Sequence, residues 1–182
     1  MNQDKHRSLS AFFLLLTALS VAGCVQISGP GNSDPVIVTG PVMMTVTTKV
    51  LDSPGAYSPK NVVALWVEDS AGTFVRTLGV RASERKQYLS AWIAKQGSST
   101  VDGVTGATRP GHSTPLTVGW DLKNSSGQAV TPGIYRLHGE LTDHNGSGAT
   151  FSMEIDISGG AANASFGPDN GFQSVTATYT VP

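Results

Sequence analysis

The chain has 182 residues, of which 39% are hydrophobic and 14% are charged, and its formal net charge is -1. This length suits one domain with tails and is too short for two domains of ordinary size. Because 12 basic residues face 13 acidic ones, the composition excludes a nucleic-acid binder that neutralises phosphates over a broad basic face. The single cysteine excludes an intramolecular disulfide framework, a cysteine-rich zinc site and a haem attached through two thiols.

The N-terminal segment predicts an export signal. Lys5 and Arg7 form a short basic head, and residues 9–21 are almost all apolar. This stretch is shorter than the about 20 apolar residues that cross a bilayer, so a cleaved signal is favoured over a membrane-spanning helix. Residues 21–24, Val-Ala-Gly-Cys, resemble the lipobox of bacterial lipoproteins. The resemblance implies that Cys24 becomes the lipidated N-terminus of the mature chain.

Lipidation implies a membrane anchor. Three acyl chains on Cys24 would hold the protein on a membrane, because two already suffice. Val25 stands where an aspartate would indicate retention at the inner membrane, which favours the outer membrane in a cell that has one. The alternative is an ordinary secretory signal with a chance cysteine. We divide the chain into a lipoprotein signal peptide at 1–23, a Gly-, Pro- and Ser-rich flexible tether at 24–41, and a domain at 42–182.

The domain shows the alternation of apolar and polar residues that is typical of half-buried strands. With one continuous apolar run that contains Trp66, this pattern predicts about seven short strands. The expected strands lie at residues 44–50, 62–67, 74–80, 116–121, 135–141, 151–158 and 174–181. We therefore expect an all-β fold, an immunoglobulin-like β-sandwich, with one short helix and one long loop.

The expected helix follows the third strand. Ser83 is placed to cap a helix from Glu84 to about Gln96, and Gly97 is its expected stop. Its apolar side chains, including Trp92, fall on one face. Packing against a sheet explains that face more simply than direct binding of a ligand.

A local pattern at residues 120–135 resembles the hairpin of the immunoglobulin-like domain in flagellar hook-capping proteins. It consists of Trp120, Asp121, Gly127, Val130, Pro132, Gly133 and Tyr135. Residues 124–127, Asn-Ser-Ser-Gly, are expected to form a tight turn. This resemblance concerns the fold and implies no chemistry.

The long loop at residues 97–115 contains a pattern that suggests attachment of a cofactor. The pattern consists of Asp102, Thr105, Gly106, Ala107, Thr108 and Arg109. It resembles the flavinylation motif of FMN-binding domains in membrane redox pumps. The resemblance implies that an FMN transferase joins FMN, through its phosphate, to the hydroxyl of Thr108. It also implies that Asp102 contacts the transferase or its metal ion, and that the Gly-Ala pair leaves room for that enzyme.

Several readings of this loop remain open. The pump motif usually has a second hydroxyl residue two positions after the acceptor, where this chain has Pro110. Arg109 and His112 could offset phosphate charge or simply be solvated, and Trp92 or Trp120 could stack on the flavin ring or belong to the core. The loop as a whole could also be a Gly- and Thr-rich surface loop without a cofactor.

A wider resemblance covers roughly residues 43–158. In this region the chain resembles a family of predicted periplasmic domains of unassigned function. The matching segments are residues 61–69 and 72–78, the helix around Trp92, the Val-Thr-Gly-Ala-Thr-Arg loop and the Trp-Asp to Gly-x-Tyr hairpin. Members often occur with flavin-based extracytoplasmic electron transfer. Residues 142–146 depart from the family, which usually has more basic and histidine residues there.

These observations lead to two functional hypotheses. The first is a lipid-anchored electron carrier, not an enzyme, with covalent FMN on Thr108. Its expected partners are an FMN transferase, extracytoplasmic redox proteins and, through Cys24, a membrane. The alternative is a non-catalytic β-sandwich lipoprotein for surface assembly or partner binding. A hydrolase is disfavoured, because His112, His138 and His144 lack a nucleophile partner and metal-ligand spacing.

Overall fold

The computed structural model describes residues 40–48, 61–97, 104–106 and 114–181. The expected signal peptide, nearly all of the tether, and Cys24 lie outside the described residues. The strands are β1 (Val42–Thr48), β2 (Val62–Asp69), β3 (Phe74–Arg81), β4 (Val104–Gly106), β5 (Leu116–Trp120), β6 (Ile134–Thr142), β7 (Ala149–Asp156), β8 (Ala162–Phe166) and β9 (Phe172–Tyr179). A 3-10 helix, η1 (Lys86–Tyr88), precedes the α-helix α1 (Ser90–Gln96).

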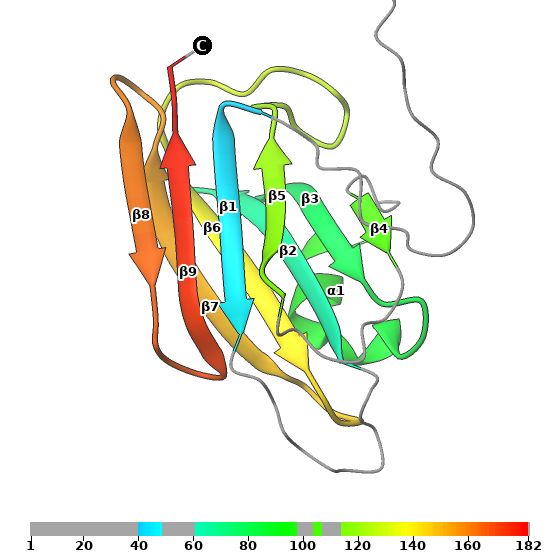
Figure 1. Ribbon diagram of the computed structural model, residues 1–182. Coiled ribbons are helices and arrows are strands. Elements are labelled where there is room, and N and C mark those ends of the chain that lie inside the picture. The colour runs from blue at the N-terminus through cyan, green and yellow to red at the C-terminus, as the bar shows by residue number, and fades with distance from the viewer. Residues whose placement is uncertain (1–39, 49–60, 98–103, 107–113, 182) are drawn as a thin grey trace, which may run out of the picture. The chain divides into compact units, whose positions relative to one another are not determined.

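The strands form two sheets (Figure 1). One has the order β5-β1-β9-β8 and the other has the order β4-β3-β2-β6-β7. All neighbouring strands are antiparallel except β3 and β4, which are parallel. The predicted all-β sandwich with one short helix is confirmed, and β4 and β8 add to the seven expected strands.

The main core lies between the sheets and is built by the alternating apolar residues. On β1 it holds Val42, Met44 and Val46, while Leu65 and Leu137 come from the opposite sheet. Each such side chain contributes roughly 1.5–3 kcal/mol when it is fully buried. The two-residue period therefore selects the face that each strand turns toward the core.

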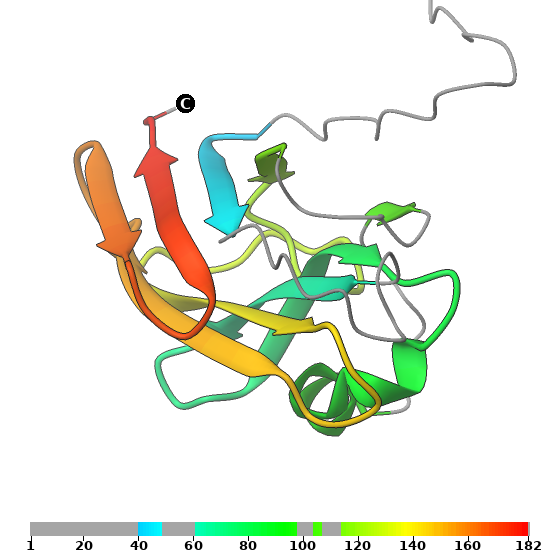
Figure 2. The ribbon, with the colours of Figure 1, turned by 60° about the horizontal axis from the view of Figure 1, so that its bottom comes forward.

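A second, smaller core lies on the other face of the five-stranded sheet, where α1 packs (Figure 2). Its buried residues are Val62, Ala64, Trp66, Val80, Leu89 and Trp92. The central strand β2 is thus covered on both faces, which is why its residues 62–67 are continuously apolar. The expectation that the helix packs on a sheet is confirmed.

The start of the helix differs from the prediction. Ser83 does not cap a helix, because Arg85 adopts a left-handed backbone with φ of 63° and only a 3-10 turn follows. The α-helix begins at Ser90 without a side-chain cap from its own segment. The carboxylate of Glu140, on β6, instead accepts the backbone N–H of Trp92 at 3.0 Å. A tertiary contact therefore supplies the cap that sequence assigned to a local residue.

The expected turn at residues 124–127 is confirmed. The Asn124 side-chain oxygen accepts the backbone N–H groups of Ser126 and Gln128, each at 3.0 Å. Gly127 has φ of +77°, a conformation that favours glycine. At the end of this segment the Tyr135 hydroxyl donates to a backbone carbonyl four residues upstream at 2.7 Å.

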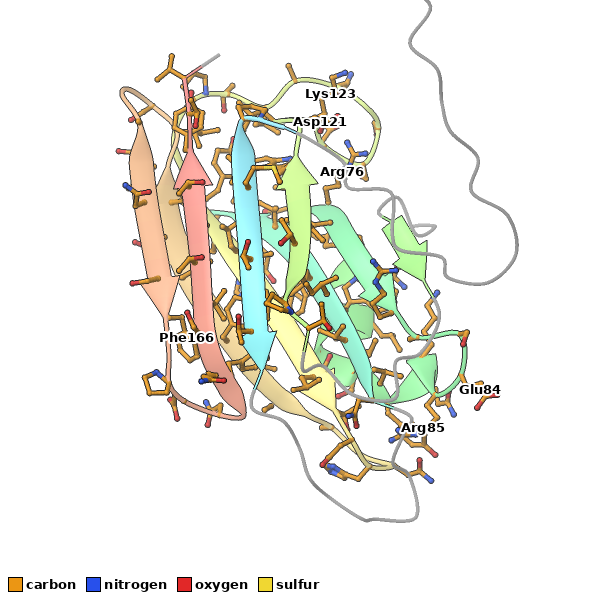
Figure 3. The ribbon with its side chains drawn as sticks, in the orientation of Figure 1. Arg76, Glu84, Arg85, Asp121, Lys123 and Phe166 are labelled. Carbon is orange, nitrogen blue, oxygen red and sulfur yellow. The ribbon has the colours of Figure 1, made fainter. Side chains whose placement is uncertain are left out.

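One ion pair joins the two sheets at the end where β5 stops. Arg76, on β3, donates to the carboxylate of Asp121 at 3.0 Å, and Figure 3 shows the two side chains near Lys123. Both partners are partly exposed, so the pair contributes at most about 1 kcal/mol.

Candidate functional site

The flavinylation-like loop is described only in part. Thr105 and Gly106 lie on β4, where they pair in register with Val80 and Arg81 of β3. Asp102, Ala107, Thr108 and Arg109 lie outside the described residues, as does His112. Because β4 is the last strand in the order of its sheet, Thr105 and Gly106 lie at a sheet edge.

The two tryptophans that could have stacked on a flavin ring belong to the core. Trp92 lies on α1 and is buried against the five-stranded sheet, where its indole N–H donates to the Thr77 hydroxyl at 3.0 Å. Trp120 is buried in the main core, where its ring meets the edge of Tyr135 at 5.0 Å between centroids. The core interpretation of both residues is therefore correct, and neither offers an open ring face.

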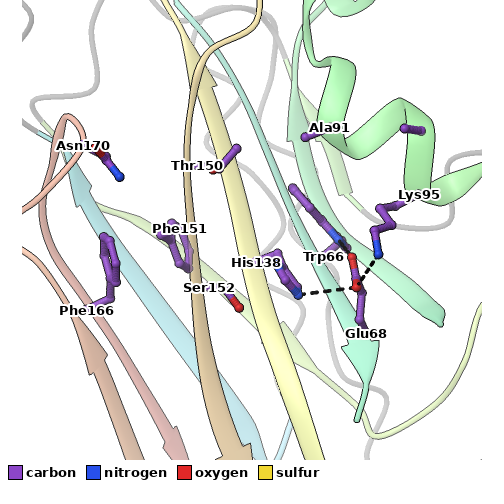
Figure 4. Close-up of a pocket in the computed structure, with 11 residues that line it drawn as sticks. Trp66, Glu68, Ala91, Lys95, His138, Thr150, Phe151, Ser152, Phe166 and Asn170 are labelled. Carbon is purple, nitrogen blue, oxygen red and sulfur yellow. Dashed lines mark hydrogen bonds and ion pairs between the residues drawn. The ribbon is translucent and has the colours of Figure 1, made fainter. Parts of the chain in front are cut away.

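A pocket of about 410 Å³ lies beside α1 on the outer face of the five-stranded sheet (Figure 4). Its lining comes from β2, α1, β6, β7, β8 and the turn after β8. The lining residues are Trp66, Glu68, Ala91, Ala94, Lys95, His138, Thr150, Phe151, Ser152, Phe166 and Asn170. Pockets of this size accept small organic molecules.

Strand register assembles the floor of this pocket. Trp66 on β2 pairs with His138 on β6, and His138 pairs with Ser152 on β7. The imidazole of His138 stacks on the Trp66 indole, with centroids 5.2 Å apart and planes inclined by 10°. The three side chains form one row across the sheet, because paired residues point to the same face.

Glu68 is the centre of the pocket's charges. Its side chain is only 4% exposed. One carboxylate oxygen accepts the Trp66 indole N–H at 2.8 Å, and the other accepts the Lys95 ammonium at 2.8 Å. Burial alone would raise the pKa of Glu68, but the hydrogen bonds from Lys95 and Trp66 outweigh burial and hold the pKa below its ordinary value.

His138 is a neutral neighbour of this carboxylate at pH 7. Burial lowers its pKa below the ordinary histidine value, although the negative charge of Glu68 acts in the opposite direction. Its Nε2 atom is buried and lies 3.7 Å from the Glu68 carboxylate, too far for a hydrogen bond. Protonation would turn this contact into an ion pair.

Sequence reasoning did not identify this pocket. The sequence patterns place Trp66 in a continuous apolar strand and give His138 no catalytic partner. The alternation does place Trp66 and Glu68 on one face of β2, but nothing local shows that His138 lies opposite Trp66. Among the described residues, no group of His, Cys, Asp and Glu is arranged to hold a metal ion.

Comparison with known proteins identifies a family. The sequence model of a family described as "Predicted periplasmic protein (DUF2271)" matches residues 43–171. The chain belongs to this family. The match covers most of the domain and includes both the pocket and β4. It supports an extracytoplasmic location, which is also what the expected export signal predicts. No curated protein and no solved structure gives a significant match. Within the described part of the chain, no helix is long and apolar enough to cross a membrane.

Proposed function

We propose that the protein is a lipid-anchored, extracytoplasmic electron carrier with FMN attached through its phosphate to Thr108. The observation that carries this proposal is the motif at residues 102–108 within a domain of a periplasmic family. Covalent flavinylation of this kind requires export, and residues 1–24 supply a lipoprotein-type signal.

The residues of the loop fit such a group. A phosphoester needs an aliphatic hydroxyl, and Thr108 provides one next to the small residues Gly106 and Ala107. The strand β4, which ends at Gly106, is an edge strand with β3 as its partner. A modifying enzyme can therefore approach this end of the motif without opening a sheet.

In this proposal the protein positions the cofactor, and the cofactor carries the electrons. When bound, FMN supplies reversible oxidation and reduction, a chemistry that the side chains of the mature chain do not offer. The acceptor Thr108 follows the described strand β4 by two residues in sequence, and the expected tether at residues 24–41 would give the domain reach from the membrane. Arg109 follows the acceptor directly and is suited to offset phosphate charge.

Co-expression with an exported FMN transferase tests the proposal. We expect the intact mass to rise by one FMN less water and the denatured protein to show flavin fluorescence. Thr108→Ala should abolish both signals, whereas Thr108→Ser, which keeps the hydroxyl, should retain them. Ser99→Ala removes another hydroxyl of the same loop and should change nothing. An unmodified wild-type protein, under conditions that label a known acceptor, would refute the proposal.

The second candidate function is a binding module for surface assembly. It is favoured by the outer face of the four-stranded sheet, where Thr45 pairs with Thr117 on one side and with Thr176 on the other, and Thr176 pairs with Ser165. This row carries hydroxyls and no charge, as a face suited to contact with a neutral polymer or protein would. Normal flavinylation of the protein would not exclude this role, but an unflavinylated protein would leave it as the better explanation.

A further inference from the structure

We propose that the pocket beside α1 binds an uncharged, flat ring that carries carbonyl groups. This is the chemistry shared by quinones and by the ring system of a flavin. The proposal stands on the pocket alone and is independent of FMN attachment at Thr108. It rests on three properties of the lining, namely its balanced charge, its aromatic and aliphatic surface, and its unused hydrogen-bond donors.

The charges of the lining are already compensated. Glu68 and Lys95 form an ion pair at 2.8 Å, and Lys95 also donates to the backbone carbonyl of Gly72 at 3.2 Å. Burial keeps His138 neutral at pH 7. A charged ligand would therefore be desolvated here without gaining a free counter-charge, which disfavours anions and cations alike.

The apolar part of the lining is suited to a flat molecule. Trp66 and His138 are stacked nearly parallel on one side of β7. Phe151 and Phe166, with ring centroids 5.6 Å apart, border the pocket from the core side of β7; Phe151 is 3% exposed and Phe166 is partly exposed (Figure 4). Ala94 on α1 adds a small apolar wall. Trp66 is 2% exposed and its ring stacks on His138, so the apolar surface open to a ligand comes from His138, Phe166 and the small residues Ala91 and Ala94. This surface favours a small planar ring over a bulky or flexible ligand.

The polar part of the lining offers donors. Thr150 and Ser152 are exposed on β7, and Asn170 follows β8. None of these three side chains forms a hydrogen bond with another described residue. Hydroxyl and amide groups can donate to carbonyl oxygens without adding charge. A neutral ring with carbonyls would thus gain both stacking and hydrogen bonds.

Binding can be measured on the mature chain with Cys24→Ser and Thr108→Ala, so that neither lipid nor FMN is attached. The probes are 2-methyl-1,4-naphthoquinone, lumiflavin and, as a flat anion, 2-naphthoate. We expect calorimetry to give a Kd on the order of 10–100 µM for at least one neutral ring. The binding of 2-naphthoate should be at least about ten-fold weaker, because its charge has no free partner. Whichever neutral probe binds more tightly identifies the source of the ring.

Filling the pocket from exposed positions localises the binding. Ser152→Trp on β7 and Ala94→Trp on α1 each place bulk in the pocket and should weaken binding at least about ten-fold. Thr176→Trp is the matched control, since it is also an exposed hydroxyl position in mid-strand but lies on the other sheet. Circular dichroism confirms folding of each variant, and the helix variant serves if the strand variant does not fold. Absence of binding by both rings, binding that survives both filled pockets, or equally tight binding of 2-naphthoate would overturn the proposal.

Discussion

Gly139 is the residue at which a single methyl group should disturb both the core and the pocket. It lies on β6, opposite Leu65 on one neighbouring strand and Phe151 on the other. A Cβ atom added here would lie 2.2 Å from a ring carbon of Phe151 and 2.9 Å from a methyl carbon of Leu65. Both distances are shorter than van der Waals contact, so Gly139→Ala must displace the Phe151 ring.

The displacement is costly because the ring is enclosed. Phe151 is buried, and its ring packs against those of Phe172 and Phe166 at centroid distances of 4.9 and 5.6 Å. Overpacking of this kind costs about 1–3 kcal/mol. The lower entropy of the unfolded alanine chain offsets about 0.4–1 kcal/mol of that. The midpoints of these two ranges give an expected net loss of about 1.3 kcal/mol in the free energy of unfolding, with weaker ring binding in the pocket.

Urea denaturation followed by tryptophan fluorescence measures this loss. Gly159→Ala is the control, because no atom lies within 4 Å of its added Cβ, and its stability should stay within about 0.5 kcal/mol of wild type. In the double variant Gly139→Ala/Phe151→Leu the smaller side chain should remove part of the clash, so the two effects should not add. A Gly139→Ala protein as stable as the control would refute the packing argument.

The remaining predictions concern the helix cap, the buried histidine and the anchor. Glu140→Gln removes the charge from a buried carboxylate that caps α1 and should cost about 1–2 kcal/mol by urea denaturation, whereas exposed Glu154→Gln should cost less than about 0.5 kcal/mol. Because burial lowers the pKa of His138 in the folded state, the unfolded state takes up this proton first, so stability present above about pH 6.5 should be lost as the pH falls below it. Thermal melts should show a flatter pH dependence for His138→Gln than for the wild type, and equal slopes in the two proteins would contradict the assignment. Cys24→Ser should move the protein from the membrane fraction to the soluble periplasmic fraction, and a wild-type protein without acyl chains by mass spectrometry would exclude lipidation.

Local patterns predicted the parts of the fold that local physics controls. The two-residue alternation and one continuous apolar run predicted seven strands, and all seven are present. The pattern missed β8, whose inward residues Ala162 and Ala164 are weakly apolar, and β4, which has three residues and forms by pairing with β3. The helix was placed too early, because its cap comes from Glu140 on a distant strand rather than from Ser83.

The two candidate sites also differ in whether local sequence or tertiary structure determines them. The flavinylation motif is a contiguous set of residues ending at Thr108, so the sequence by itself determined where a cofactor is proposed and which hydroxyl would hold it. The pocket was decided only by tertiary structure. Its Trp66, His138 and Ser152 belong to three strands and become one row through register, and Lys95 reaches Glu68 only because α1 packs on that face. Register and helix packing depend on the whole set of buried contacts, which no short stretch of sequence contains.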